Sequence, residues 1–153
     1  MPTIYMDGVF DLFHVGHLKA IEKCYTLGSM ITDQKKELDI EDECNIIIGV
    51  ISDEDTESYK RPPIISLDER SHIIRSLKHV DRVISPSPLI VTRKFIEENK
   101  IDIVVHAFAD DEDFENQKDQ HKELIEMGIF QRIPYTSEIS TTRILKKIRG
   151  QKD

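Results

Sequence analysis

The sequence has only two cysteines among its 153 residues, Cys24 and Cys44, and they are not spaced like metal ligands. Such sparse cysteine argues against a disulfide framework or a cysteine-rich metal site and favours a reduced, intracellular protein. No apolar run approaches the roughly 20 residues that a membrane-spanning helix needs. The N-terminus also lacks a basic segment followed by an apolar stretch, so no signal peptide is expected. We therefore expect a soluble cytoplasmic protein.

The chain also lacks an excess of basic residues. Its 29 acidic residues outnumber its 21 lysines and arginines, which gives a net charge of −8. Broad binding to nucleic acid is not expected, because no surplus of positive charge exists to neutralise phosphates. The common phosphate-binding loop, the dinucleotide glycine fingerprint and the nucleophile elbow are absent as well. Any chemistry on phosphate is therefore expected to proceed without a covalent intermediate.

What the sequence does contain is a regular alternation of strand and helix patterns. The length of the chain suits a single domain over residues 1–153. Strands are predicted at 3–6, 45–51, 82–85, 101–106 and 129–133, and helices at 17–27, 67–78, 91–99, about 117–127 and 140–149. Strands that alternate with helices pair in parallel through right-handed crossovers. We therefore predict a three-layer α/β sandwich around a five-stranded parallel sheet.

Two acidic segments interrupt this rhythm, at 28–44 and 109–119. Clusters of carboxylates can bind metal ions, but charge runs of this kind are more often solvated. We therefore expect both segments to be loops, and the identity of any metal ligands stays open.

The most informative segment is Asp7-Gly-Val-Phe-Asp-Leu-Phe-His14-Val-Gly16-His17, which lies between the first predicted strand and the first predicted helix. The N-terminus of a helix favours anions, because its first N–H groups are unpaired and its dipole is positive there. Gly16 allows close approach to the backbone. His14 and His17 can donate hydrogen bonds to phosphate oxygens. The segment is therefore a candidate phosphate site.

Further polar clusters follow the other predicted strands. Ser52-Asp53-Glu54 and then Lys60 follow the second strand, His106 ends the fourth, and Ser137 to Arg143 begins the last helix. In parallel sheets, ligands bind beyond the carboxyl ends of the strands. Four polar clusters that converge there favour a polyphosphate ligand, and with it phosphoryl or nucleotidyl transfer that depends on positioning and charge stabilisation.

The segment from Asp7 to His17 strongly resembles the signature of the cytidylyltransferase family, above all of the enzymes that act on phosphocholine and phosphoethanolamine. Other segments in the same order extend the likeness across nearly the whole chain: Ile48 to Glu54, Glu69-Arg70, His79 to Ile84, and Ile139 to Thr142. The resemblance implies a Rossmann-like fold and a single nucleotidyltransferase domain.

The resemblance implies transfer of CMP from CTP to a small phosphoalcohol, with release of pyrophosphate and with Mg²⁺ accompanying the triphosphate. It implies catalytic roles for His14, His17 and Lys60. It implies that the nucleotide contacts Gly8, Val9, Phe10, Gly16, His106, Ile139, Ser140 and Thr141. It implies that the acceptor contacts Asp11, Asp53 and Lys60.

The chain departs from the family pattern near the expected base and acceptor sites. His106-Ala107-Phe108 stands where relatives carry aspartates, Tyr135 replaces an arginine, and Glu138 replaces a glycine. The chain has no tryptophan, and Leu89 occupies a position where the choline enzymes carry one. A quaternary ammonium is therefore less expected than a primary amine or a polyol, so phosphocholine, phosphoethanolamine and glycerol phosphate stay open. Adenylyl transfer, or nucleotide binding without turnover, are the alternative functions.

The resemblance also implies a homodimer, because the segment His79 to Asp81 lies in the family's subunit interface. The amphipathic membrane-binding tail of the choline enzymes is absent from this sequence, so stable membrane binding is not expected.

Overall fold

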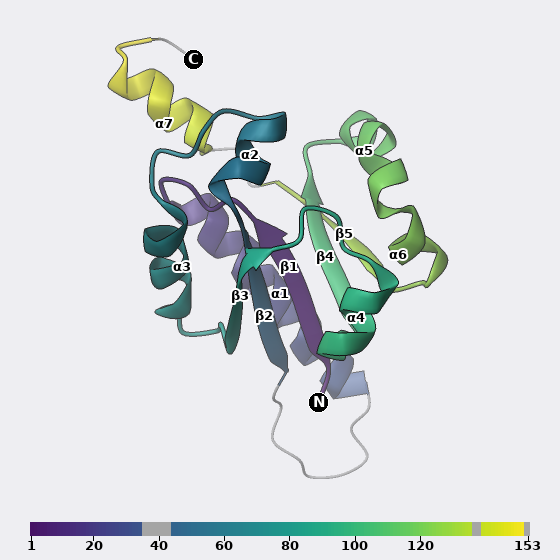
Figure 1. Cartoon of the computed structure of the whole chain (residues 1–153). Coiled ribbons are helices and arrows are strands. Elements are labelled where there is room, and N and C mark those ends of the chain that lie inside the picture. Colours follow the sequence, from purple (N-terminus) through teal and green to yellow (C-terminus); the bar gives the residue numbers. More distant parts are fainter. Residues whose placement is uncertain (35–43, 136–138, 152–153) are drawn as a thin grey trace.

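The computed structural model describes residues 1–34, 44–135 and 139–151. One sheet of five parallel strands crosses the molecule in the order β3-β2-β1-β4-β5 (Figure 1). The strands are β1 (Thr3–Gly8), β2 (Asn45–Ile51), β3 (Arg82–Ser87), β4 (Ile103–Phe108) and β5 (Phe130–Pro134). All five predicted strands and their parallel pairing are thus confirmed.

The strand order explains where a ligand site can form. From the central strand β1 the chain builds outward through β2 to β3, and then returns to place β4 on the other side of β1. The connections after β1 and β4 therefore leave the sheet in different directions. A crevice at such a switch point is the usual ligand position in an open α/β sheet.

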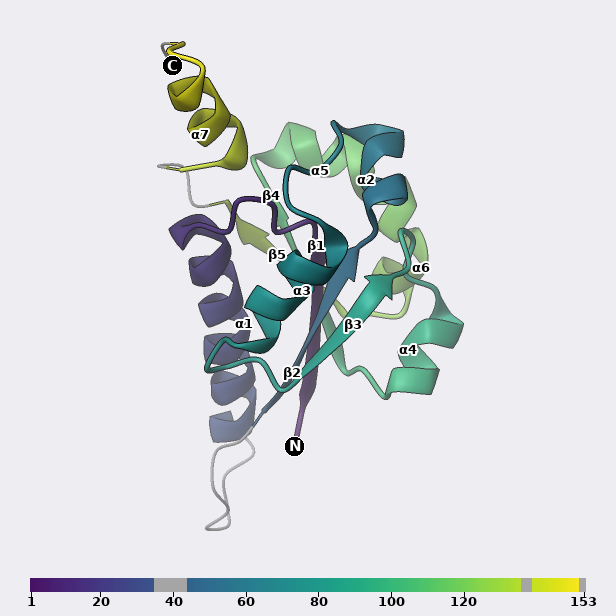
Figure 2. The same ribbon diagram turned by 60° about the vertical axis from the view of Figure 1, so that its left-hand side comes forward.

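Helices cover both faces of the sheet, as the predicted three-layer sandwich requires (Figure 2). Helices α1 (Val15–Gln34) and α3 (Leu67–Arg75) lie on one face, and α4 (Arg93–Asn99) and α6 (Lys122–Glu126) on the other. The first face buries Ile4, Met6, Ile46, Ile48 and Val50, and the second buries Tyr5, Ile47 and Val104. This alternation along each strand follows from the period of two. Among the described residues, no helix has the length and hydropathy needed to cross a bilayer.

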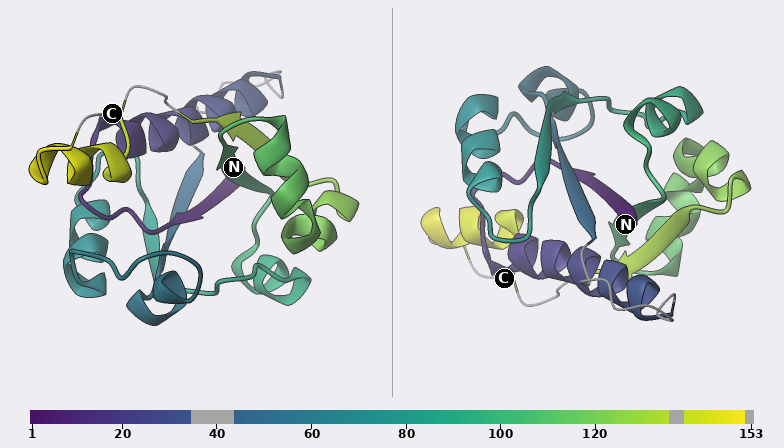
Figure 3. Two further views of the ribbon diagram at one scale, coloured as in Figure 1. Left: turned by 90° about the horizontal axis from the view of Figure 1, so that it is seen from above. Right: turned by 90° about the horizontal axis from the view of Figure 1, so that it is seen from below.

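The last helix, α7 (Thr141–Ile148), lies beyond the carboxyl ends of the strands instead of covering a face of the sheet (Figures 1 and 3). Its N-terminal end points back toward the molecule, near the start of α1. Two helix N-termini that are distant in sequence are thus brought to the same end of the sheet.

Two helices were not predicted from the sequence: α2 (Asp53–Tyr59) and α5 (Asp111–Gln117), which runs into the short 3-10 helix η1 (Lys118–His121). The prediction of a loop over 109–119 is therefore wrong. Ser52 and Asp110 accept N–H bonds as N-caps, and acidic residues in each first turn complement the helix dipole. The acidic run is thus a helix start. The other predicted loop, 28–44, begins inside α1, and its acidic residues 37–43 lie outside the described residues.

Candidate active site

The connection between β1 and α1 is a tight loop held in an uncommon backbone conformation. Phe10 and Leu12 have positive φ angles of 56° and 47°. For residues other than glycine this costs on the order of 1–3 kcal/mol, and it persists only where the surroundings hold it. Phe10 is 5% exposed and packs edge-on against His17, and a Cβ on Gly8 would lie 3.0 Å from the Phe10 ring. Burial of Phe10 thus fixes the loop that precedes the two histidines.

His14 and His17 stack face to face at the start of α1, with ring centroids 3.8 Å apart. Each ring accepts a backbone hydrogen bond at Nδ1: Gly16 N–H donates to His14 at 3.0 Å, and His14 N–H donates to His17 at 3.3 Å. In a neutral imidazole the nitrogen that accepts carries no proton. The proton of both rings therefore sits on Nε2, and both rings offer an N–H donor.

Both histidines are neutral at physiological pH. Burial, helped by electrostatic interactions with His14 and Lys60, lowers the pKa of His17 to about 3. Burial also lowers the pKa of His14. The pair is therefore a set of fixed hydrogen-bond donors in the free protein. A bound polyanion would favour the protonated form of either ring and so shift its pKa upward.

The segment that begins α7 meets this loop directly. A Cβ on Gly16 would lie 2.8 Å from His14 Cε1 and 3.3 Å from the carbonyl oxygen of Ile139. Ser140 is the N-cap of α7, and Thr141 Oγ1 donates to the carbonyl of Asp11 at 2.9 Å. The structure therefore brings together Gly16, Ile139 and Thr141, which were predicted to bind the nucleotide from opposite ends of the sequence.

The two helices that meet here differ from most others in the charge of their first turn. Neither α1 nor α7 has an acidic residue there, whereas α2, α3 and α5 each begin with two or three. Acidic side chains would neutralise the positive helix ends. Their absence at α1 and α7 leaves both dipoles available to an anion.

Lys60 lies at the C-terminal end of α2, where its backbone N–H caps the helix by donating to Thr56. Its charge helps to lower the pKa of His17. Burial and the charge of Arg61 lower the pKa of Lys60 itself, and Asp11 opposes that shift. The charges of Lys60 and Asp11 thus act on His17, and the catalytic roles of Lys60 and His17 stay predictions.

Asp11 and Asp53, both predicted to bind the acceptor, already have partners within the chain. The Asp11 side chain is buried, and its oxygens accept the N–H groups of Leu12, Ile64 and Ile65 at 2.8–3.1 Å. Asp53 forms an ion pair of 2.5 Å with Arg70. Acceptor binding by these two residues stays a prediction.

His106 lies near the end of β4, beside the end of β1. Its Nδ1 is 3.9 Å from the Asp7 carboxylate, and its ring packs against Phe108 and His121. Burial lowers the pKa of His106 to about 4 and raises the pKa of Asp7 to about 7. A neutral imidazole and a carboxyl group that titrates near neutral pH thus stand at the switch point of the sheet.

No group of three or more histidine, cysteine or carboxylate side chains within residues 1–34, 44–135 and 139–151 is arranged to bind a metal ion. Mg²⁺ commonly binds through one or two carboxylates together with substrate phosphates. The Mg²⁺ that the family resemblance implies stays a prediction.

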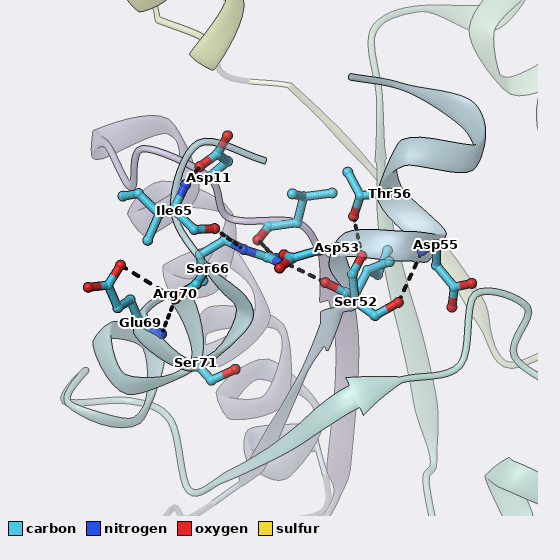
Figure 4. Close-up of polar contacts among 12 residues, drawn as sticks. Asp11, Ser52, Asp53, Asp55, Thr56, Ile65, Ser66, Glu69, Arg70 and Ser71 are labelled. Atoms are coloured by element: carbon cyan, nitrogen blue, oxygen red, sulfur yellow. Dashed lines mark hydrogen bonds and ion pairs between the residues drawn. The ribbon is translucent and has the colours of Figure 1, made fainter. Parts of the chain in front are cut away.

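Sequence reasoning missed two arginines that shape this region. Arg70 is fully buried in α3 and bonds to Val9, Ile51, Ile65 and Asp53 (Figure 4). Arg132 of β5 lies 4.1 Å from the ring centroid of Phe114 in α5 and forms an ion pair of 3.0 Å with Asp111. Glu69-Arg70 is part of the family resemblance, but nothing in its sequence context indicates that Arg70 is buried.

Comparisons with known proteins identify the family of this chain. The profile of the cytidylyltransferase-like family matches residues 5–147. The chain is 35% identical over 150 residues to choline-phosphate cytidylyltransferase of Saccharomyces cerevisiae, and 34% identical over 150 residues to ethanolamine-phosphate cytidylyltransferase of Dictyostelium discoideum. Each alignment covers 95% of this chain, but only 31% and 37% of the respective relatives. The chain thus spans about a third of the length of these curated relatives.

A solved structure supports the fold alone. The lipopolysaccharide core biosynthesis protein of Thermoplasma volcanium superposes with a TM-score of 0.63 at 22% identity, over 89% of this chain and 97% of the other. The match of the family profile over residues 5–147 shows that this chain belongs to the cytidylyltransferase-like family.

Proposed function

We propose that this protein transfers CMP from CTP to a small phosphoalcohol and releases pyrophosphate. The observation that carries the proposal is the stacked pair His14 and His17, whose Nδ1 atoms are tied to the backbone. That pair lies where the N-termini of α1 and α7 meet. The identity of 34–35% to enzymes named for choline phosphate and ethanolamine phosphate supports the choice of nucleotide and acceptor class.

In this reaction a phosphate oxygen of the acceptor attacks the α-phosphorus of CTP. The bond from that phosphorus to the bridging oxygen of the β-phosphate breaks, and pyrophosphate leaves with the electron pair. The Nε2–H groups of His14 and His17 donate to the phosphate oxygens whose charge grows in the transition state. Donors that are fixed in advance stabilise that charge without reorganisation.

The remaining groups of the site hold the triphosphate. The N-termini of α1 and α7 supply unpaired N–H groups to its oxygens, and Ser140 and Thr141 lie at the start of α7. Lys60 adds a positive charge from the segment after α2. Mg²⁺ would accompany CTP as part of the substrate and would neutralise charge on its phosphates. Backbone groups of Gly8, Val9 and Phe10, together with His106, would face the nucleoside.

The acceptor is more consistent with a primary amine or a polyol than with a quaternary ammonium. A quaternary ammonium is commonly bound over open aromatic faces. In this chain the guanidinium of Arg132 already lies 4.1 Å from the centroid of Phe114 and 5.7 Å from that of Phe108. Phosphoethanolamine and glycerol phosphate are therefore the acceptors that we favour, with phosphocholine as the comparison.

The test is a pyrophosphate-release assay with each of these three acceptors, run with CTP and in parallel with ATP. We expect release with CTP that depends on one of the favoured acceptors. Release only with ATP would assign an adenylyl-transferring enzyme. Tight binding of CTP without release under any condition would make the chain a nucleotide-binding module, and either result would overturn the proposal.

A homodimer through the segment that precedes β3 is part of the proposal. Asp81 is hydrogen-bonded to Ile46 of β2. Its carboxylate accepts the N–H of Ile46 at 2.7 Å, and its own N–H donates to the Ile46 carbonyl at 2.9 Å. His79 stacks on Tyr25 of α1 with ring centroids 4.1 Å apart. The segment thus has a fixed shape that suits an interface. Sedimentation equilibrium would test it, and a monomer at micromolar concentration would contradict it.

A further inference from the structure

Arg70 is the largest fully buried side chain of the protein among its described residues, and it carries a charge. Its Nε donates to the carbonyl of Ile65 at 2.9 Å, and its Nη1 donates to the carbonyls of Val9 at 2.7 Å and Ile51 at 2.9 Å. Its Nη2 donates to Asp53 at 2.5 Å. All three nitrogens of the guanidinium are therefore engaged.

The four partners of Arg70 come from four different parts of the chain, and Figure 4 labels Asp53 and Ile65 among them. Val9 belongs to the loop that leads to His14 and His17, and Ile51 is the last residue of β2. Asp53 begins α2, the helix that ends next to Lys60, and Ile65 lies on the segment that runs from Lys60 to α3.

Asp11 completes the same arrangement from the opposite side. Its carboxylate accepts the N–H groups of Ile64 and Ile65, at 2.8 and 2.9 Å. The Ile65 residue is thus held at both ends, with its N–H bonded to Asp11 and its carbonyl bonded to Arg70. Through this residue the histidine loop and the segment after Lys60 are fastened to each other.

A buried arginine is weak support for stability alone, because removing its charge from water costs several kcal/mol that its partners must offset. Three of its four bonds are made to main-chain carbonyls of the segments that carry the site. A guanidinium has donors in a planar fork, and a lysine ammonium cannot span the same carbonyls. The arrangement is therefore one that requires arginine.

We infer that Arg70 is a positioning residue, which together with Asp11 and Asp53 fixes the loop of His14 and His17 relative to Lys60. This inference rests on the proposed function. It also assigns Asp11 and Asp53 to this framework, in which their carboxylates bond to the chain and do not touch the acceptor.

The first test is Arg70→Lys, with Arg75→Lys in the exposed last turn of α3 as the matched control. A displacement of about 1 Å at a reacting group can lower a rate about 10²-fold. We expect kcat of Arg70→Lys to fall by about that factor. The KM values for CTP and for the acceptor should change far less, because the groups that bind them remain. The control should behave as the wild type.

The second readout is amide hydrogen exchange, which does not depend on turnover. The N–H groups of Leu12, Ile64 and Ile65 should exchange slowly in the wild type and faster in Arg70→Lys. Amides of the sheet core, such as that of Ile47, should be unchanged. If the wild type shows no turnover, the proposed function fails, and the exchange rates still decide whether Arg70 holds the two segments.

Asp53→Ala serves if Arg70→Lys does not fold, since the Asp53 side chain is 45% exposed. We expect a smaller loss of kcat with an unchanged KM for the acceptor. Three results would overturn the inference: wild-type kcat and exchange in Arg70→Lys, an equal loss in Arg75→Lys, or a rise confined to the acceptor KM in Asp53→Ala.

Discussion

His14 and His17 show how the role of a residue depends on which of its atoms the backbone occupies. The bonds to Nδ1 of both rings leave Nε2–H as the donor in each. Replacing His17 with alanine removes one such donor and the stacking partner of His14. Losing one preorganised donor typically costs a factor of about 10²–10³ in rate.

We therefore expect His17→Ala to lower kcat by about 10²–10³ while the protein remains folded, as judged by circular dichroism. His72→Ala, at an exposed position of α3, is the control and should keep wild-type activity. A soluble, folded His17→Ala protein with near-normal turnover would refute the assignment of the site.

Replacing Gly16 with alanine should affect the activity and the thermal stability of the protein in different ways. A Cβ there would lie 2.8 Å from His14 Cε1, so alanine would push the His14 ring out of its bond with the Gly16 N–H. Alanine also favours a helix over glycine by about 1 kcal/mol. We expect Gly16→Ala to lose activity and yet melt no earlier than the wild type. Val15→Ala, which is exposed in the same turn, should leave both unchanged, and full activity in Gly16→Ala would contradict the close packing.

At the scale of secondary structure elements, the site depends on the junction of α7 with the loop after β1. A single side-chain bond joins Thr141 to the carbonyl of Asp11. A hydrogen bond of this kind contributes about 1 kcal/mol, or about fivefold in an equilibrium. We expect Thr141→Ala to weaken CTP binding by about that factor, measured by calorimetry. Thr141→Ser keeps a hydroxyl at this position and should bind CTP as tightly as the wild type, and so should the control Thr142→Ala. If Thr141→Ser binds CTP as weakly as Thr141→Ala, the hydrogen bond to Asp11 does not explain the loss of affinity.

The elements themselves could be predicted unevenly from the sequence. The five strands followed from apolar runs such as Asn45–Ile51, which is buried almost throughout. The helices α2 and α5 escaped prediction because each lacks an apolar stripe and begins with acidic residues, which also suit a solvated loop. In the sequence only the N-cap residues Ser52 and Asp110 indicate that helices begin here. A serine or an aspartate also occurs in loops, so the residue identifies a helix start only once its bond to a helix N–H group is known.

The candidate site was predictable where one short segment carries it, and not where distant segments meet. The loop from Asp7 to His17 could be recognised because its strand, glycine and helix start are contiguous. The ring of bonds around Arg70 joins residues up to 61 positions apart in sequence. No local pattern encodes such contacts. The expectation that Asp11 contacts the acceptor likewise could not account for the N–H groups of Ile64 and Ile65, which fold onto it from a distant segment.

At the scale of the whole molecule, the fold packs ionisable groups in their neutral forms on both sides of β1. Burial lowers the pKa of His17 to about 3 and that of His106 to about 4, and it lowers the pKa of His14 and His121 as well. Asp7 opposes them, because burial raises its pKa to about 7. The stability of the protein toward acid is set by the balance of these groups.

Between pH 6.5 and 4 the unfolded chain binds protons at these histidines that the folded protein does not. Stability therefore falls as pH decreases through this window. Asp7 acts in the other direction, since its folded form binds a proton below about pH 7 that the unfolded form takes up only near pH 3.8. Because the histidines with lowered pKa outnumber this single carboxyl group, we expect the urea midpoint to drop from pH 6.5 to pH 4.5. His17→Gln removes one titrating group and should flatten the profile, whereas Asp7→Asn removes the opposing group and should steepen it. A wild-type midpoint that is constant or rises toward pH 4.5 would show that these histidines are not held neutral by the fold.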